Sequence, residues 1–266
     1  MSKLLKEICE RKKYEIEYLK KKCSLKSLKK LLPKKSNRGF KNLIINSNQN
    51  KKNNIIAEIK KSSPSAGEII KNYFPENIAT NYEKSGAGAI SILTETYFFK
   101  GNVDHLSLIN KKTNIPILRK DFIIDPYQIF ESKIYKADAI LLIASILSDK
   151  EIQEYIKIAD DIGLDCLIEA HTKDELKRVI KIDYPIIGIN NRNLDNLSVN
   201  MKNTVDLINL IPKNFSVVAE SGIKDNKDIQ IYNKNGIHNF LIGESLLRST
   251  NINHKFMELL KNDISS

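Results

Sequence analysis

The chain has 266 residues, of which 41% are hydrophobic, and it carries a formal charge of +11 at pH 7. Its longest apolar stretches, such as Ala139–Ile143, are far shorter than the roughly 20 residues of a membrane-spanning helix, and its first residues lack the apolar core of a secretory signal. The three cysteines, Cys9, Cys23 and Cys166, are too scattered for a disulfide framework or a metal cluster. We therefore expect a cytoplasmic protein with no metal, no other cofactor and no membrane partner.

The positive charge is concentrated at the start of the chain. Residues 1–61 contain 19 basic and 5 acidic side chains, whereas the rest of the chain contains 24 basic and 27 acidic ones. A nucleic-acid-binding arm is one interpretation of this bias. The lysines alternate with Leu, Ile and Tyr in helical spacing, however, which favours solvated helix faces. We expect no nucleic-acid partner, although a positive potential attracts small anionic substrates.

Residues 1–53 are expected to form an amino-terminal helical extension. Leucines and isoleucines at helical spacing predict a helix over residues 4–19, and Leu25–Leu32 predicts a second helix that ends before Pro33. Because these helices have no neighbouring strand in the sequence, their apolar faces must be buried elsewhere, and we expect them to pack on the rest of the chain. The polar stretch Asn46–Asn54 predicts an exposed loop.

From Asn54 onward, short apolar runs rich in β-branched residues recur at intervals of roughly 20 to 35 residues, the length of a strand–helix unit. Such runs are typical of parallel strands buried on both faces. An open doubly wound sheet would also fit, but eight runs without a linker favour one domain, residues 1–266, built as a (β/α)₈ TIM barrel. The runs are Ile55–Lys60, Ala89–Thr94, Pro116–Asp121, Ala137–Ala144, Leu164–Ala170, Pro185–Asn190, Ser216–Ser221 and Asn239–Gly243.

Amphipathic stretches predict helices between these runs. Asp149 and Thr172 are predicted caps, the latter forming a capping box with Glu175. Gly86 and Gly163 follow helix ends, where left-handed backbone is needed. The predicted helices include Pro75–Ser85, Asp125–Tyr135, Asp149–Ile162, Thr172–Ile182 and Lys202–Leu210.

In a barrel of this kind, reactive side chains lie at the carboxyl ends of the strands. Strand side chains alternate, so Glu58 and Lys60 share one face while Ile59 takes the other. A single charge at such a position could simply form a salt bridge that closes the barrel. Several together perturb one another's pKa values, which suits general acid–base catalysis. The candidate catalytic residues are Glu58, Lys60, Lys120, Glu169, Asn190 and Glu220.

Glycines after the last two strands indicate a phosphate site. Ser221, Gly222 and Gly243 lie where barrels commonly bind phosphate through backbone N–H groups, and the Ser63 hydroxyl could contribute from the first loop. The alternative is that these glycines only permit tight turns.

Metal catalysis and nucleophilic catalysis find little support. The four histidines show no metal-ligand spacing, and no Ser-His-Asp or Cys-His arrangement is recognisable. His171, two residues after Glu169, is expected to support the site and not to act in it.

The strand ends and their loops carry a set of specific motifs, the most specific being Ile56–Ser65 (IAEIKKSSPS). The others are Leu93–Glu95 with Phe98 and Gly101, Pro116–Ile123, Ala139–Ile143, Leu167–His171, Gly188–Leu194, Val218–Ile223 and Phe240–Gly243. This set closely resembles the indole-3-glycerol-phosphate synthase family of tryptophan biosynthesis. The resemblance covers nearly the whole chain and includes the amino-terminal helices.

The resemblance implies a carboxy-lyase that converts 1-(2-carboxyphenylamino)-1-deoxyribulose 5-phosphate to indole-3-glycerol phosphate, with loss of CO₂ and water. It implies that Lys120 is the general acid, with Arg119 keeping its pKa low, and that Glu169 is the general base. Lys60 is expected to pair with the substrate carboxylate and to assist dehydration, with Glu58 holding its ammonium in place. The division of the later steps among these residues stays open.

The resemblance also implies the residues that bind the substrate. Asn190 and Glu220 match positions that contact substrate hydroxyls or act electrostatically, and Arg192 joins the binding residues. Glu244 departs from the family pattern, since some relatives carry serine there and a carboxylate facing the phosphate would repel it. The phosphate site is expected to consist of Ser63, Ser221, Gly222 and Gly243, and the wall around the anthranilate ring of Phe98, Phe122 and Leu141.

Two alternatives were weighed. A related phosphate-binding barrel such as phosphoribosylanthranilate isomerase needs one acid–base pair and no decarboxylation pocket, so the paired lysines Lys60 and Lys120 argue against it. A basic barrel that binds nucleic acid through residues 1–61 would lose affinity steeply with salt. We expect instead a monomer that acts on a phosphorylated small molecule.

Overall fold

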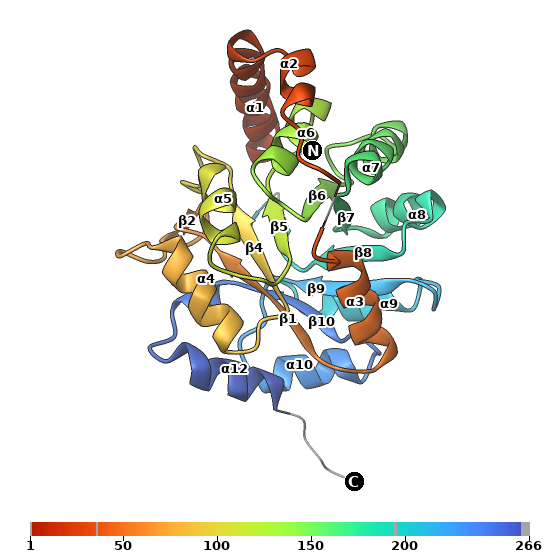
Figure 1. Cartoon of the computed structure of the whole chain (residues 1–266). Helices are drawn as coiled ribbons and strands as arrows, with labels where there is room; N and C mark the ends of the chain where they lie inside the picture. The colour runs from red at the N-terminus through yellow and green to blue at the C-terminus, as the bar shows by residue number, and fades with distance from the viewer. Residues whose placement is uncertain (1, 36, 194–195, 262–266) are drawn as a thin grey trace.

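Eight parallel strands close into a barrel that the helices surround (Figure 1). The computed structural model describes residues 2–35, 37–193 and 196–261, so the ends of the expected 1–266 domain and Leu194 of the GINNRNL motif lie outside the described residues. The first strand pairs with the last, which removes free sheet edges and confirms the predicted TIM barrel. The barrel strands are β1 (Asn54–Ile59), β4 (Ala89–Leu93), β5 (Ile117–Lys120), β6 (Ala139–Ile143), β7 (Asp165–Ala170), β8 (Ile186–Asn190), β9 (Ser216–Glu220) and β10 (Asn239–Ile242).

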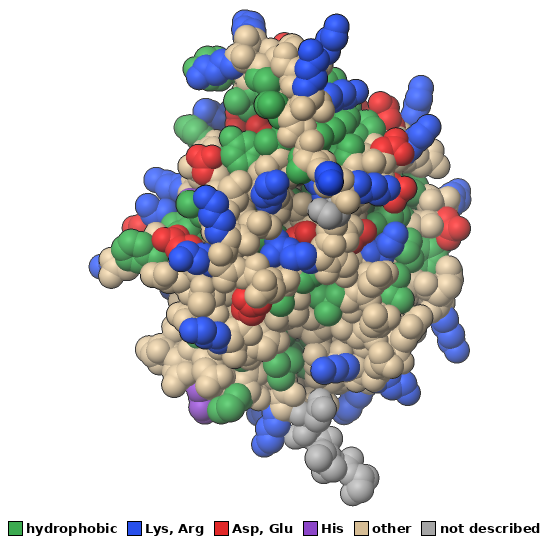
Figure 2. Space-filling view, viewed as in Figure 1, with side chains coloured by type: hydrophobic (Ala, Val, Ile, Leu, Met, Phe, Trp, Pro, Cys, Tyr) green, Lys and Arg blue, Asp and Glu red, His purple; other side chains and the backbone are tan. Residues whose placement is uncertain are grey.

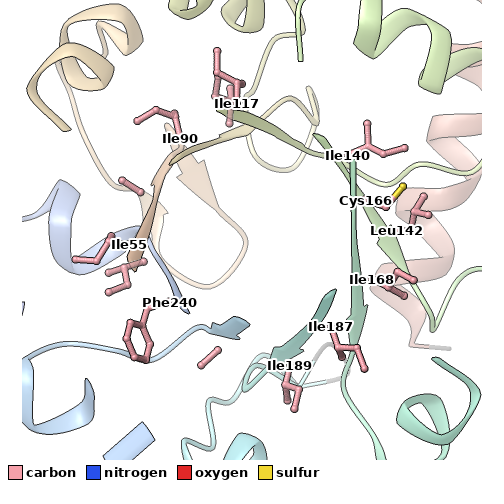
Figure 3. Packing of buried hydrophobic residues seen from close by; sticks show 14 of the residues in the cluster. Ile55, Ile90, Ile117, Ile140, Leu142, Cys166, Ile168, Ile187, Ile189 and Phe240 are labelled. Carbon is pink, nitrogen blue, oxygen red and sulfur yellow. The ribbon is translucent and has the colours of Figure 1, made fainter. Parts of the chain in front are cut away.

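Alternation along each strand divides the side chains of the barrel into two sets. On β1, Ile55 and Ile59 point outward into a core shared with the helices, whereas Ile56 belongs to a cluster inside the barrel. Figure 3 shows the outward set, including Ile117 and Ile168, arranged around the ring of strands. Both sets are buried, which explains why the strands appear in the sequence as nearly continuous apolar runs. Inward positions at the strand ends are left to carry polar groups into the barrel mouth.

The helices between the strands match the predicted stretches closely, with one cap corrected. Asp149 is the first residue of its helix and not the cap, because Ser148 is the N-cap and forms a full capping box. The Thr172 hydroxyl accepts the Glu175 N–H, but the predicted capping box is incomplete, because the Glu175 carboxylate accepts the N–H of His171. Gly163 ends its helix with a φ of 75°. These helices are α4 (Pro75–Lys84), α5 (Asp104–Asn110), α6 (Pro126–Ile134), α7 (Asp149–Ile162), α8 (Lys173–Ile182), α9 (Lys202–Ile208), α10 (Asn226–Asn233), α11 (Glu244–Leu247) and α12 (Ile252–Leu260). A short hairpin, β2 (Ser62–Ser63) and β3 (Gly67–Glu68), follows β1.

The amino-terminal residues form three helices, of which the first two pack beside α6 (Figure 1). They are α1 (Lys3–Lys22), α2 (Leu25–Lys30) and α3 (Phe40–Gln49). Ile16 of α1 and Leu28 of α2 share a buried cluster with Tyr127 and Phe130 of α6. In the part of the chain that the structure describes, no helix has the length and apolar content needed to cross a membrane.

The stretch Asn46–Asn54 is not the exposed loop that the sequence predicted, because α3 covers its first half. Phe40 and Ile44 are fully buried in the interior cluster at the amino-terminal end of the barrel, and Ser47 is buried one turn later. The Asn239 amide of β10 donates a 3.0 Å hydrogen bond to the Ile44 carbonyl. Tertiary packing of one face therefore outweighs the low helix propensity of this Asn-rich segment.

Candidate active site

A cavity of about 670 Å³ occupies the end of the barrel at which the strands finish. The predicted residues that line it are Glu58, Lys60, Ser63, Lys120, Phe122, Leu141, Glu169, Asn190, Arg192, Glu220, Ser221, Gly222 and Gly243. Of the predicted set, Phe98 does not line this cavity. Strand alternation and the positions of the strand ends therefore predicted one site from residues that are up to 185 positions apart in the chain.

The Lys120 ammonium lies between two buried carboxylates. Its Nζ is 3.0 Å from Glu169 Oε2 and 3.1 Å from Glu220 Oε2, and the three side chains are 14%, 2% and 1% exposed. Burial alone would lower the pKa of Lys120, but these carboxylates, with Glu58 further away, outweigh it and hold the pKa above its ordinary value. Lys120 is therefore protonated at neutral pH.

The two carboxyl groups facing Lys120 titrate very differently. Burial would raise the pKa of Glu169, but the charges of Lys120 and His171 hold it well below its ordinary value. Burial, reinforced by the neighbouring Glu169 carboxylate, raises the pKa of Glu220 to about 8. Glu169 is thus a carboxylate at neutral pH, while Glu220 retains a proton. Two acidic groups whose environments separate their pKa values in this way suit the roles of base and acid.

Gly188 makes the room that Glu220 occupies. It lies on β8 opposite Glu169 of β7, and a Cβ atom there would overlap Glu220 Oε1 and touch Leu167. Gly188 was not among the residues predicted to form the site. A glycine inside a fully apolar strand is nevertheless a recognisable sign that another group approaches the backbone closely.

Arg119 does not keep the pKa of Lys120 low, so that expectation is wrong. It precedes Lys120 on β5, and strand alternation turns its guanidinium away from the cavity, towards Asp121 at 3.0 Å and Glu131 at 2.8 Å. The same buried guanidinium also donates a hydrogen bond from its Nε to the Thr94 hydroxyl, at 3.1 Å. Arg119 thus fixes the backbone of β5 from outside the barrel.

Lys60 and Glu58 form a direct ion pair on the cavity wall, at 15% and 5% side-chain exposure. Gly243 of the last strand end faces this pair, since a Cβ atom there would overlap Glu58 Oε2. Gly243 is therefore required for the close approach of the Glu58 carboxylate, a role that the sequence analysis did not foresee.

The loop after β9 has a strained backbone beside the cavity. Ser221 has a φ of 65°, which is uncommon for a residue with a side chain, and Gly222 follows with a φ of 91°. A Cβ atom at Gly222 would overlap Met201 Sδ and Val199 Cγ1, so only glycine fits. The Asn191 amide holds the loop by donating a 3.0 Å hydrogen bond to the Ser221 carbonyl. These constraints shape a concave stretch of backbone next to Gly243.

Cations surround this end of the cavity. Lys224, Arg248 and Lys255 line it, and the sequence analysis did not identify them. Glu244, the departure from the family pattern, has its Oε1 2.9 Å from Arg248 Nε. Its negative charge is thus countered locally by a neighbour one helical turn away.

Phe99 takes the place predicted for Phe98. It lines the cavity with its ring centroid 6.2 Å from that of Phe122, whereas Phe98 packs edge-on against Tyr97, with centroids 5.0 Å apart. The buried Glu95 carboxylate accepts the backbone N–H groups of Tyr97, Phe98 and Phe99 and so fixes the conformation of the loop. This loop geometry decides which aromatic ring faces inward, and the strand pattern carries no information about it.

The first turns of α1 form part of the cavity wall. The sequence alone did not determine whether the extension reaches the barrel mouth. Leu4, Leu5 and Ile8 line the cavity, and the latter two are buried. One turn further along α1, the buried Lys12 ammonium lies 3.2 Å from Oδ1 of Asp121, which is the residue that follows Lys120 in the chain. The extension therefore contributes apolar surface to the barrel mouth.

Among the described residues, no group of three or more His, Cys, Asp and Glu side chains is arranged to hold a metal ion. His171 lies 3.2 Å from Glu169 through its Nε2 but does not line the cavity. The lysine and glutamate side chains that line the cavity can take part in acid–base catalysis.

Solved structures with the same fold include two phosphate-handling barrels. A thiamine phosphate pyrophosphorylase from Pyrococcus furiosus superimposes with a TM-score of 0.56 at 13% identity and covers 79% of this chain and 95% of its own. An N-acetylmannosamine-6-phosphate 2-epimerase from Clostridium perfringens gives a TM-score of 0.53 at 15% identity, covering 73% of this chain and 88% of its own. At these identities the likeness concerns the fold alone.

Sequence relatives are much closer. The chain is 40% identical over 260 residues to an indole-3-glycerol phosphate synthase of Legionella pneumophila (strain Paris), covering 98% of this chain and 99% of that protein. It is 48% identical over 205 residues to the enzyme of the same name from Alkaliphilus metalliredigens (strain QYMF), covering 77% and 78%. The family model described as indole-3-glycerol phosphate synthase matches residues 5–259. The chain therefore belongs to the indole-3-glycerol phosphate synthase family.

Proposed function

We propose that the cavity at the barrel mouth binds 1-(2-carboxyphenylamino)-1-deoxyribulose 5-phosphate and closes its indole ring, with release of CO₂ and water. The observation that carries this proposal is the Lys120 ammonium held between Glu169 and Glu220 in the wall of the cavity. Ring closure joins an aromatic carbon to the ribulose carbonyl carbon, so the carbonyl oxygen must gain a proton. Lys120 is placed to donate it.

The remaining charged groups match the later steps. Lys60, on the cavity wall, is suited to pair with the substrate carboxylate until CO₂ leaves, and Glu58 fixes its ammonium. Dehydration then needs an acid for the departing hydroxyl and a base for the proton lost from the new ring. Glu169, ionised at neutral pH, is suited to be that base. Glu220 and Asn190 remain to bind substrate hydroxyls.

The two ends of the substrate differ in chemistry, and so do the two ends of the cavity. The aromatic ring fits between Phe122, Leu141 and Phe99, with Leu5 and Ile8 of α1 closing the wall. The phosphate fits the concave backbone after β9 and β10, together with Ser63 and the nearby cations. Holding both ends fixes the reacting carbon atoms in an attack geometry.

We extend the proposal to how the protein acts in the cell. Every group invoked belongs to one chain, so a monomer suffices, and the three unpaired cysteine thiols fit a reducing cytoplasm. Nucleic acid is not a partner in this proposal. Lysines and arginines are spread over the face that Figure 2 presents, with acidic side chains among them, and Lys12 of the basic extension is buried in an ion pair.

Indole fluorescence tests the proposal, because the chain contains no tryptophan and so has little background at indole wavelengths. Purified protein incubated with the carboxyphenylamino-deoxyribulose phosphate should produce indole signal at the same rate with and without a metal chelator. Phosphoribosylanthranilate, the substrate of the competing isomerase reaction, should not be consumed. Consumption of phosphoribosylanthranilate without indole formation would replace the proposed activity with the isomerase one.

A further inference from the structure

We propose that His171 decides which of the two buried glutamates is the base, by keeping Glu169 ionised and thereby leaving the proton on Glu220. This inference rests on the proposed ring-closing function. Because His171 does not line the substrate cavity, it is a positioning residue and not a catalytic one.

The two glutamates share the Lys120 ammonium and interact with one another. Each places its Oε2 close to the Lys120 Nζ, at 3.0 and 3.1 Å, and each is almost wholly buried. Glu58 is a further negative charge that acts on Lys120. Two carboxylates beside one ammonium do not both ionise readily in a poorly solvated site. A further partner must therefore determine which one keeps the proton.

The outer oxygens of the two carboxyl groups provide that difference. Glu169 Oε1 lies at ion-pair distance, 3.2 Å, from His171 Nε2, whereas Glu220 Oε1 has neither an ion-pair nor a hydrogen-bond partner among the described residues. A positively charged imidazole at this distance lowers the free energy of the Glu169 anion much more than that of a Glu220 anion. The proton consequently remains on Glu220.

Glu175 of α8 keeps His171 charged. His171 Nδ1 lies 3.5 Å from Glu175 Oε2, and the same oxygen accepts the His171 backbone N–H at 2.7 Å. Burial would lower the pKa of His171, but its two glutamate partners raise it to about 9. The imidazole is therefore an imidazolium at neutral pH, ion-paired with Glu175 and with Glu169.

The other groups that face His171 do not cancel this effect. It borders a second cavity of about 370 Å³, in which the remaining charged side chain of the described lining is Arg192. From α9, the Asn203 amide donates a 3.1 Å hydrogen bond to the His171 carbonyl, and α1 contributes Ser2 and Leu5 to the same cavity. The site therefore has one nearby acid, Glu175, to balance the charge of His171 on the side away from the substrate.

Replacing the charge while keeping a hydrogen-bond donor tests the proposal. In His171→Gln, the acid limb of the kcat/KM profile for ring closure should move to higher pH by at least about one unit, with KM close to the wild-type value. Activity below that limb should fall about tenfold and recover as pH rises. His238→Gln is the matched control, because His238 is a buried histidine beside Asn53 at the opposite end of the barrel. An unmoved acid limb in His171→Gln would overturn the proposal.

A readout without substrate separates this inference from the proposed function. Carbon-13 NMR of labelled glutamate carboxyls in the free protein should show Glu220 titrating far above Glu169, and the two titrations should converge in His171→Gln. Glu175→Gln keeps the hydrogen-bond acceptor and should also bring the two titrations closer together, but by less than His171→Gln does. This second variant tests the proposal if His171→Gln does not fold. Unchanged titrations in both variants would refute the role of His171. Normal titrations in a wild-type protein that forms no indole would refute the ring-closing function alone.

Discussion

Glu220 holds a carboxyl group at 1% exposure in the barrel mouth, with its Oε1 atom lacking a hydrogen-bond partner among the described residues. A buried polar atom without a partner lowers the stability of the folded state. Its neighbour Glu169 is similarly buried but has both oxygens engaged, by Lys120 and His171. The difference between the two residues therefore reflects the chemistry of the site, and it predicts how stability depends on pH.

Glu220→Gln should raise stability by a margin that increases with pH. The unfolded carboxyl titrates near 4.5, whereas burial first, and then Glu169, raise its folded pKa to about 8. Between these values the unfolded chain releases a proton that the folded protein retains, so folding loses stability as pH rises, up to about 8. Thermal unfolding of variant and wild type from pH 4.5 to 9 measures the margin. A constant difference in Tm over this range would contradict the raised pKa of Glu220.

Gly188→Ala should displace Glu220 and impair catalysis more than folding. The added Cβ atom overlaps Glu220 Oε1, and crowding of this kind in a packed interior destabilises by about 1–3 kcal/mol. We expect kcat to fall at least tenfold with little change in circular dichroism. Gly236→Ala is the control, since it incurs the strain of a φ of 76° in open space and should leave kcat unchanged. Equal effects of the two substitutions on kcat would show that Gly188 only preserves stability.

The sequence predicted the site residues at the strand ends well, but in the loop after β4 it indicated Phe98 where Phe99 lines the cavity. Lys120 and Glu169 lie at the ends of β-branched runs, and strand alternation alone places both inside the barrel. Phe98 and Phe99 are adjacent in a loop, and only the hydrogen bonds of Glu95 determine which of them faces the cavity. The effect of Arg119 was misjudged because adjacency in sequence was taken as adjacency in space, whereas neighbours on a strand point to opposite faces.

At the scale of secondary-structure elements, α1 is connected to the catalytic strand β5 through one buried ion pair. Lys12 is 3% exposed and pairs with Asp121, whose other oxygen accepts from Arg119 and Thr94. Asp121 also accepts the Phe122 N–H at 2.8 Å, so the same carboxylate fixes the loop that carries an aromatic wall residue. The position of α1 and the end of β5 are therefore linked.

Lys12→Met should loosen α1 from the barrel mouth. Loss of a buried charged hydrogen bond destabilises by about 2 kcal/mol, and Asp121 keeps Arg119 as a partner. Because Leu5 and Ile8 of α1 wall the cavity, KM should rise more than kcat falls. Urea unfolding and steady-state kinetics measure the two effects. Lys13→Met, on the exposed face of α1, is the control and should change neither the stability nor the kinetics. If Lys12→Met also changed neither, the ion pair would not position the helix.

The elements themselves were predictable where one periodicity dominated. All eight strands follow apolar runs, and α7 combines a capping box with an amphipathic pattern and a terminal glycine. α3 was missed because its Asn- and Ser-rich sequence has weak intrinsic helix propensity, and its formation depends on burying Phe40 and Ile44 against strands that follow much later in the chain. Local patterns cannot report such distant partners.

At the scale of the whole molecule, we propose that residues 1–53 and the barrel form one domain. α3 closes the amino-terminal end of the barrel through Phe40, and α1 and α2 bury Ile16 and Leu28 on α6. Unfolding in urea should therefore follow coincident curves by circular dichroism and by tyrosine fluorescence, which reports on Tyr14 and Tyr18 in α1 as well as on the barrel. A separate early transition in tyrosine fluorescence would mean that the extension folds independently.

The position of Lys120 between two glutamates is the feature on which the proposed mechanism depends most. Single-turnover indole formation by wild type and by Lys120→Met, with substrate binding measured in parallel, tests it most directly. We predict that Lys120→Met remains folded and binds the substrate but closes the ring about 10²–10⁴-fold more slowly, the usual contribution of a positioned general acid. Ring closure by Lys120→Met at the wild-type rate would contradict the assignment of Lys120 as the acid that starts the reaction.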